Sequence, residues 1–148
     1  MIVVDANVCL FFFVMSERTE LARSVYERDS DWIAPEILLH EFVNVLSTWG
    51  KNRLFRLSDL LKTWRQAENL FENCLVRTDM VDVLSLAIER RISVYDAEYV
   101  AVARLHDIEL VTEDKELLGK FPGTALSMAD YLKRANPPSF SPKDPDLH

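Results

Sequence analysis

The chain opens with MIVVDANV at residues 1–8, a short apolar run that ends in an acid. Residues 1–4 are β-branched and apolar, which predicts a strand buried within a parallel sheet. The run stops at Asp5, and Asn7 can cap the apolar segment 8–15 that follows. Ligands of open α/β sheets bind at the carboxyl ends of the strands. Asp5 is therefore a candidate functional residue, although an acid at this position is also a common turn former.

Further short strands alternate with helical segments along the rest of the chain. Strands are predicted at residues 31–34, 75–77, 108–112 and 124–126, and helices at 16–29, 36–49, 57–74, 80–90, 93–106, 114–120 and 127–134. We expect Pro35 in the first turn of its helix, Gly50 at that helix's end, and Ser58 as the next cap. Apolar spacing in the predicted helix 57–74 places Leu61 in the core. Apolar residues recur at helical spacing in the predicted helix 80–90, at Val83, Leu84, Ala87 and Ile88, and are expected to face the core. This alternation predicts an α/β domain with a parallel sheet.

Length and composition indicate one folded domain with a tail. The chain has 148 residues, 49% of them hydrophobic, which is enough to build a core without disulfides. Cys9 and Cys74 lie in apolar stretches and are expected to be buried thiols. Four of the six prolines follow Asn136, so we expect a domain over residues 1–135 and an extended or disordered tail over 136–148.

The charge balance excludes a protein that merely coats nucleic acid. The net charge is −7, from 17 Lys and Arg against 24 Asp and Glu, whereas such proteins need excess positive charge. An enzyme with a small basic strip remains possible, and Lys51, Arg53 and Arg56 form the densest basic cluster. Phe55 within it either stacks on a base or packs inward. No apolar run is long enough to span a bilayer, and no signal peptide is evident, so we expect a soluble cytoplasmic protein.

Three further acids lie in surroundings that are unusual for a carboxylate. Glu41 lies within ILLHEFVNVL, on the same helix face as Leu38 and Val45, at or beside the buried stripe. Asp96 begins DAEYVAVARL, and Asp114 closely follows the strand IELVT. Each has an ordinary alternative: an edge position for Glu41, and a helix N-cap for Asp96 and Asp114. Ser93 can cap instead of Asp96, and small residues one turn later allow that helix to approach the sheet closely.

Taken together, these acids predict one pocket at the edge of the sheet. Two carboxylates about 6 Å apart repel by on the order of 3 kcal/mol at an effective dielectric near 20. Lys and Arg are scarce in these segments, so the natural counter-charge is a divalent cation. Oxygen ligands without Cys or His favour Mg²⁺ or Mn²⁺ over zinc.

The segments VVDANV, PEILLHEFVNVL, YDAEYVAVA and LVTED resemble the four acidic motifs of the PIN-domain nucleases, and most of all the VapC-type toxins of toxin–antitoxin pairs. The resemblance covers residues 1–132. It implies a three-layer α/β/α fold with four to five short parallel strands, and a ribonuclease that uses one or two Mg²⁺ or Mn²⁺ ions to cleave single-stranded or loop RNA. It further implies an antitoxin partner and a homodimer. The implied acids are Asp5, Glu41, Asp96 and Asp114, supported by Asn7 and Thr112. Glu113, beside Asp114, is an alternative ligand, but the motif favours Asp114.

Other functions are weighed against this one. The same fold can serve as a non-catalytic protein-binding module, and metal-dependent cleavage separates the two classes. A haloacid-dehalogenase-like phosphoryl transferase needs a second Asp where Asn7 stands. HEFVN is a near miss for the zinc motif H-E-x-x-H, because Asn44 replaces the second His.

Overall fold

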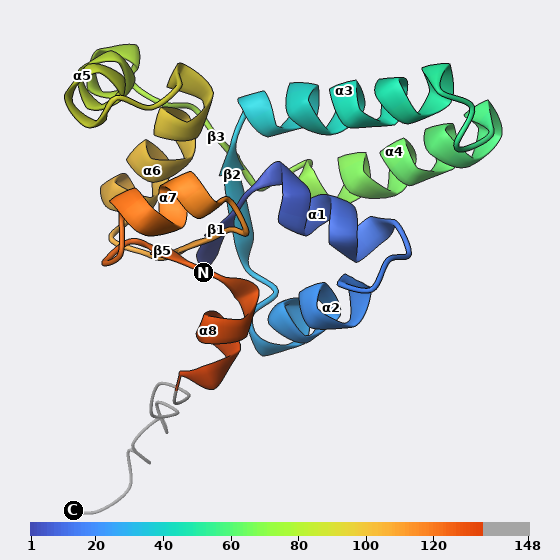
Figure 1. Ribbon diagram of the computed structural model, residues 1–148, viewed down its shortest axis with the longest axis horizontal. Helices are drawn as coiled ribbons and strands as arrows, with labels where there is room; N and C mark the ends of the chain where they lie inside the picture. Colours follow the sequence, from blue (N-terminus) through green and yellow to red (C-terminus); the bar gives the residue numbers. More distant parts are fainter. Residues whose placement is uncertain (135–148) are drawn as a thin grey trace, which may run out of the picture.

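The computed structural model describes residues 1–134 and shows a twisted parallel sheet with helices on both sides (Figure 1). The predicted tail, residues 136–148, lies outside the described residues. In chain order the elements are β1 (Ile2–Val4), α1 (Ala6–Phe13), α2 (Thr19–Arg28), β2 (Trp32–Pro35), α3 (Ile37–Lys51), α4 (Leu57–Phe71), β3 (Leu75–Val76), α5 (Met80–Arg90), α6 (Val94–His106), β4 (Leu110–Val111), α7 (Lys115–Lys120), β5 (Ala125–Leu126) and α8 (Met128–Lys133).

The five strands follow the order β3-β2-β1-β4-β5, and every neighbouring pair is parallel. The chain builds outward from β1 to β2 and β3, then returns to place β4 and β5 on the other side of β1. The connection order therefore reverses between β1 and β4, which is where open α/β sheets form a binding crevice. The predicted α/β class with a central parallel sheet of short strands is confirmed.

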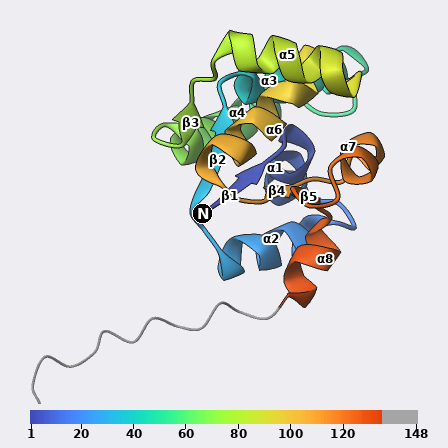
Figure 2. The same ribbon diagram turned by 90° about the vertical axis from the view of Figure 1, so that its left-hand side faces the viewer.

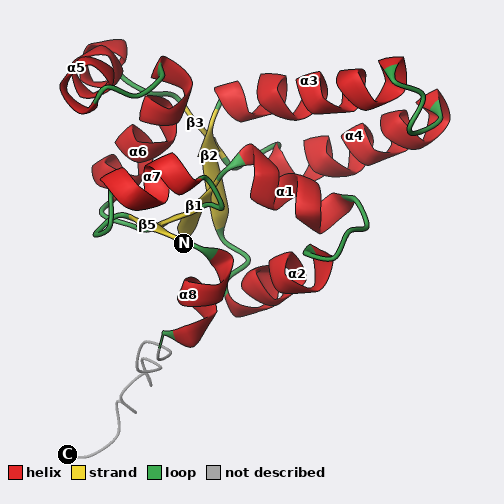
Figure 3. Cartoon of the chain, viewed as in Figure 1, coloured by secondary structure: helices red, strands yellow, loops and turns green. Residues whose placement is uncertain are grey.

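Helices form the outer layers (Figures 1 and 3). α5 and α6 lie on one side of the sheet, whereas α1 to α4 lie on the other, and the α3–α4 hairpin extends beyond the strands. Trp32 of β2 is fully buried and packs edge-on against the rings of Phe12 and Tyr26. α6 lies across the sheet through small side chains, since Ala97 and Ala103 are both fully buried. None of the described helices is both long enough and apolar enough to cross a bilayer.

Three expected helix boundaries are wrong, each for a local reason. Asp5, rather than Asn7, is the N-cap of α1, because the helix already begins at Ala6. Pro35 ends β2, where a residue without an N–H is tolerated, instead of starting α3. Ser58 lies within α4, whose N-cap is Arg56.

Gly50 does not end α3 but allows α4 to approach it. A Cβ atom at Gly50 would lie only 3.1 Å from Leu60 Cδ1, so the missing side chain leaves room for Leu60. The helix continues to Lys51, and the chain turns back at Arg53, which has a left-handed φ of 56°. Leu60 is the buried residue of this part of α4, whereas Leu61, which was expected inside, is exposed.

α5 is apolar on two opposite sides. Val83, Leu86 and Ala87 face the core, and the helix packs along α6 (Figure 2). Leu84 and Ile88, which were also expected inside, are 56% and 70% exposed, and they continue a stripe that begins at Val81. The 3.6-residue period places these side chains on the outer face, so α5 has an apolar surface that residues 1–134 do not cover.

The close packing of α6 on the sheet predicts a sensitivity to side-chain volume. Replacing Ala103 by Leu is expected to lower the free energy of unfolding by about 1–3 kcal/mol, because a buried site without spare volume must distort. Ala101→Leu, at a partly exposed position of the same helix, is the control and is expected to cost less. Urea unfolding followed by tryptophan fluorescence measures both, and equal losses would contradict this account of α6.

Candidate functional site

A pocket of about 220 Å³ opens where β1 and β4 end, at the point where the connection order reverses. Four separate segments contribute a carboxylate to its walls, and the remaining polar groups are two amides and a phenol. The acidic residues are Asp5, Glu41, Asp96 and Asp114, and the others are Asn7, Asn44 and Tyr99. The structure thus brings together all four acids that the sequence singled out. Thr112 lies beneath them, fully buried.

Asp5 is fixed by hydrogen bonds to α1 and to the end of β4. One carboxylate oxygen accepts a hydrogen bond from the Val8 N–H at 3.0 Å, which caps α1. The other accepts a hydrogen bond from the Thr112 hydroxyl. The Thr112 oxygen accepts in turn from the backbone N–H of Asp114 at 3.0 Å. This chain of contacts locks the ends of β1 and β4 in one arrangement.

Burial makes the ionised form of Asp5 costly. The residue is 6% exposed, and its pKa rises from the 3.8 of an exposed aspartate to about 6. Loss of hydration is the main cause; the hydrogen bonds from Thr112 and Val8 oppose it, while the charges of Glu41 and Asp114 add to it. A bound cation would reverse this balance.

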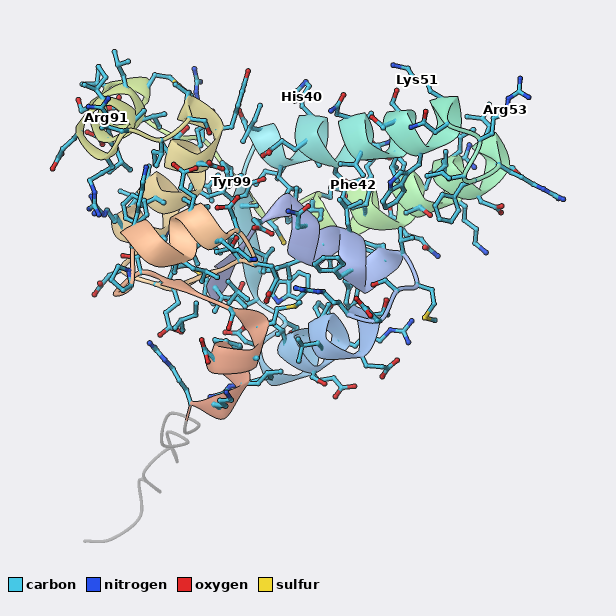
Figure 4. The ribbon with its side chains drawn as sticks, in the orientation of Figure 1. His40, Phe42, Lys51, Arg53, Arg91 and Tyr99 are labelled. Atoms are coloured by element: carbon cyan, nitrogen blue, oxygen red, sulfur yellow. The ribbon has the colours of Figure 1, made fainter. Side chains whose placement is uncertain are left out.

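Glu41 is held by a partner that the sequence analysis missed. Tyr99, labelled in Figure 4, is almost fully buried on α6. Its hydroxyl donates a hydrogen bond of 2.8 Å to Glu41 Oε1 on α3. Burial raises the pKa of Glu41, the Tyr99 hydrogen bond lowers it, and the charges of Asp96 and Glu98 raise it. The available signal was spacing, because Tyr99 follows Asp96 by three residues and shares its helix face.

Asp96 and Asp114 reach the pocket from two helix starts. Ser93, not Asp96, caps α6, and its hydroxyl accepts from the Asp96 N–H at 3.0 Å. Burial raises the pKa of Asp96, the Ser93 hydroxyl lowers it, and the charges of Asp114 and Glu116 raise it. Asp114 caps α7 through a 2.9 Å hydrogen bond from the Leu117 N–H and also lines the pocket. Asp114 is therefore both a helix cap and a pocket residue.

Glu113 and the basic cluster lie outside the pocket. The two oxygens of Glu113 bind the Arg18 guanidinium at 2.9 Å and the Met128 N–H at 2.8 Å. Lys51 and Arg53 lie at the far tip of the α3–α4 hairpin (Figure 4). Lys51 follows Glu41 by ten residues of α3, about 15 Å along the axis.

Phe55, at the same tip, packs on one side only. Its ring centroid lies 5.4 Å from that of Trp49, yet 42% of the residue stays exposed.

The side chains fit a divalent cation by chemical type, although they do not converge on one point. Several carboxylate and amide oxygens surround the pocket, which is the donor set that Mg²⁺ and Mn²⁺ prefer. Within residues 1–134, however, no group of three or more His, Cys, Asp or Glu side chains is arranged as a metal site. Capping and hydrogen bonds hold one oxygen each of Glu41 and Asp114, so binding an ion requires modest side-chain movement.

Known proteins share both the sequence and the fold. A family model described as PIN domain matches residues 2–121. Ribonuclease VapC3 of Pyrobaculum aerophilum is 27% identical over 124 residues, which cover 82% of this chain and 95% of that protein. Exonuclease VapC9 of the same organism is 35% identical over 100 residues, which cover 66% of this chain and 72% of that protein.

Among solved structures, a protein from Pyrobaculum aerophilum matches with a TM-score of 0.67 and 25% identity, over 88% of this chain and 92% of that one. A toxin–antitoxin complex from Klebsiella pneumoniae matches with a TM-score of 0.62 and 19% identity, over 86% of this chain and 98% of that one. At that identity the second likeness shows the fold alone.

The raised pKa of Asp5 predicts a pH-dependent effect of Asp5→Asn in metal-free buffer. Between about pH 4 and pH 6 the unfolded chain ionises Asp5 while the folded chain keeps it protonated, so wild-type stability falls as the pH rises. The cost above pH 6 is on the order of 3 kcal/mol. Asparagine carries no charge and does not have this cost. From pH 3.5 to pH 7.5, the unfolding free energy of Asp5→Asn should therefore rise relative to that of the wild type by the same amount.

Urea unfolding at the two pH values in EDTA measures this shift. Asp79→Asn is the matched control, because Asp79 also caps a helix, accepting from the Val81 N–H at 2.8 Å, but it is exposed and has no burial to relieve. A pH-independent gap for Asp5→Asn would show that its carboxylate is well solvated.

Proposed function

The chain belongs to the PIN-domain family, and on that premise we propose that it is a metal-dependent endoribonuclease whose catalytic residues are Asp5, Glu41, Asp96 and Asp114. The observation that carries the proposal is the acidic pocket at the β1–β4 edge, to which four segments distant in sequence each contribute a carboxylate. The relatives named VapC3 ribonuclease and VapC9 exonuclease support nuclease chemistry.

Asp5, Asp96 and Asp114 are the proposed ligands of one or two Mg²⁺ or Mn²⁺ ions, with Glu41 binding through a water or orienting the attacking water. A bound ion of this kind supplies a more acidic water and neutralises charge that develops on phosphate oxygens. Thr112 holds Asp5 in place, and Tyr99 holds Glu41. Asn7 is exposed on the pocket wall, where its amide can contact the phosphate or hold a neighbouring carboxylate.

In the proposed reaction, water attacks the phosphorus atom in line and the bond to the 3′ oxygen breaks. The products are a 5′-phosphate and a 3′-hydroxyl, and the leaving oxygen gains a proton from solvent. Single-stranded or loop RNA is the expected substrate, because its bases and backbone are accessible. Lys51, Arg53 and Arg56 are the proposed distal contacts, at the tip of the α3–α4 hairpin.

A cognate antitoxin protein is the proposed partner, and a homodimer is the proposed assembly. The Klebsiella pneumoniae complex has the same fold and is a toxin–antitoxin complex. The uncovered apolar stripe on α5 is consistent with a protein that works in an assembly. Its proposed compartment is the cytoplasm, where RNA is available.

Asp96→Asn is expected to remove cleavage while preserving the fold. Losing a direct ligand should lower metal-dependent cleavage of a labelled single-stranded RNA by roughly 100-fold or more, since even outer partners of metal ligands contribute 10–100-fold. Mn²⁺ binding heat should fall in parallel. Metal-free thermal stability should stay the same or rise, because a repulsive charge is removed.

Asp82→Asn, an equal charge change on the exposed surface of α5, is the control and should behave as wild type. Wild-type cleavage that persists in excess EDTA, or an Asp96→Asn variant that cleaves normally, would refute the metal-dependent mechanism. A large loss of metal-free stability would instead make Asp96 a structural residue. A wild-type chain that binds RNA or a partner without cleaving would favour the non-catalytic module.

The hairpin tip is expected to contribute affinity rather than chemistry. The double variant Lys51→Ala/Arg56→Ala should lower the slope of log affinity against log salt by about 1.4, or about 0.7 per lost phosphate contact to a single strand. The cleavage rate at saturating RNA should be unchanged. Arg23→Ala/Lys133→Ala removes equal charge elsewhere and is the control. An unchanged slope would exclude the tip from the RNA path.

A further inference from the structure

The pocket has an electrostatic difficulty that a nuclease must overcome. Its four carboxylates repel the phosphates on either side of the scissile bond, even when bound cations neutralise the centre. The basic hairpin tip is about 15 Å away along α3, too distant to hold the neighbouring phosphate. A cation on the elements that form the pocket would solve this, and Arg18 contacts Glu113 and Phe11, which belong to two of these elements.

Arg18 is joined to the connection between β4 and α7. Its Nη1 lies 2.9 Å from Glu113 Oε2, and Glu113 directly precedes Asp114 in the chain. The other oxygen of Glu113 accepts from the Met128 N–H at 2.8 Å, so the carboxylate that holds Arg18 is itself fixed. Glu113 is only 19% exposed, which limits the positions its partner can adopt.

Arg18 also contacts α1. Its guanidinium carbon lies 5.5 Å from the centre of the Phe11 ring, in a cation–π contact. Phe11 follows Asn7 by four residues of α1, so the two share one helix face, and Asn7 lines the pocket. The guanidinium is therefore held between the two walls, α1 and the β4–α7 connection, that carry Asn7 and Asp114.

Much of this guanidinium remains available to a ligand. The Arg18 side chain is 46% exposed, and its guanidinium donates a hydrogen bond to Glu113 through one nitrogen, Nη1. Its remaining N–H donors lie in the plane of the guanidinium, and the contacts with Glu113 and Phe11 orient that plane. A guanidinium prepared in this way suits a phosphate group, which accepts two parallel hydrogen bonds from it.

We propose that Arg18, oriented by Phe11 and Glu113, is a phosphate-binding site for the RNA strand next to the scissile bond. This inference rests on the proposed ribonuclease function and names a contact of the same site. The guanidinium contacts the backbone and not a base, so it contributes affinity equally for all sequences. It also explains the position of Glu113, which serves Arg18 and not a metal ion.

The test compares Arg18→Ala with Arg23→Ala. Arg23 lies in α2, whose N-cap is Arg18, is 47% exposed and pairs with Glu20 at 3.2 Å, so it matches Arg18 in charge, exposure and ion pairing. Both changes are made in the Asp96→Asn background, which keeps the RNA intact, and binding of labelled single-stranded RNA is followed by fluorescence anisotropy with Mg²⁺ over a range of KCl. Thermal melting is recorded in parallel.

Arg18→Ala is expected to weaken RNA binding by roughly 5- to 10-fold, the low end for a charged hydrogen bond, because the group is partly exposed. The salt slope should fall by about 0.7, and the loss should be the same for oligonucleotides of different sequence. Arg18→Lys should recover part of the slope. In the catalytic background, Arg18→Ala should raise KM more than it lowers kcat.

Two results would overturn the inference. Affinity and slope equal to those of Arg23→Ala would show that Arg18 does not contact RNA, and a drop in melting temperature alone would make its ion pair purely structural. A parent protein that binds no RNA at all would instead contradict the proposed function, and the two failures are therefore distinguishable.

Discussion

The buried carboxylate of Asp5 costs free energy when it ionises, and the edge of the sheet where the four acids meet is built around it. Its two oxygens are stabilised by one backbone N–H and one hydroxyl, which offset only part of the lost hydration. The same two contacts join α1 and β4 to the end of β1. The chain therefore keeps a costly charge in place by using it to hold the strands together, and the other carboxylates are arranged around that fixed point.

Helix capping solves a second problem, which is how to aim acids without long, flexible side chains. Asp5 and Asp114 each cap a helix with one oxygen, so each side chain has one defined direction. Ser93 takes over the cap of α6 and leaves the Asp96 carboxylate available to the pocket. The two interpretations, helix cap and pocket residue, are compatible for Asp5 and Asp114, because the capping hydrogen bond orients a side chain that also lines the pocket.

The sequence predicts the fold class and the acids because both depend on local signals. Short apolar runs ending in Asp5 and Asp114, and the apolar neighbours of Glu41, are visible without a structure. Contacts between distant segments are not visible, so Tyr99, 58 residues from Glu41, was missed. Two local signals also misled. Gly50 makes room for Leu60 instead of ending a helix, and Leu84 and Ile88 follow a helical period on the outer side of α5.

The double duty of Asp5 also limits how this site can evolve. Glutamate keeps the charge, but its longer side chain is a poor helix cap. Replacing Asp5 by glutamate would therefore weaken the capping hydrogen bond and destabilise the start of α1. At Glu41, which caps nothing and depends on one phenol, a change of side-chain length has no such penalty on helix formation. Side-chain length can therefore change on α3 at a lower cost in helix stability than at the end of β1.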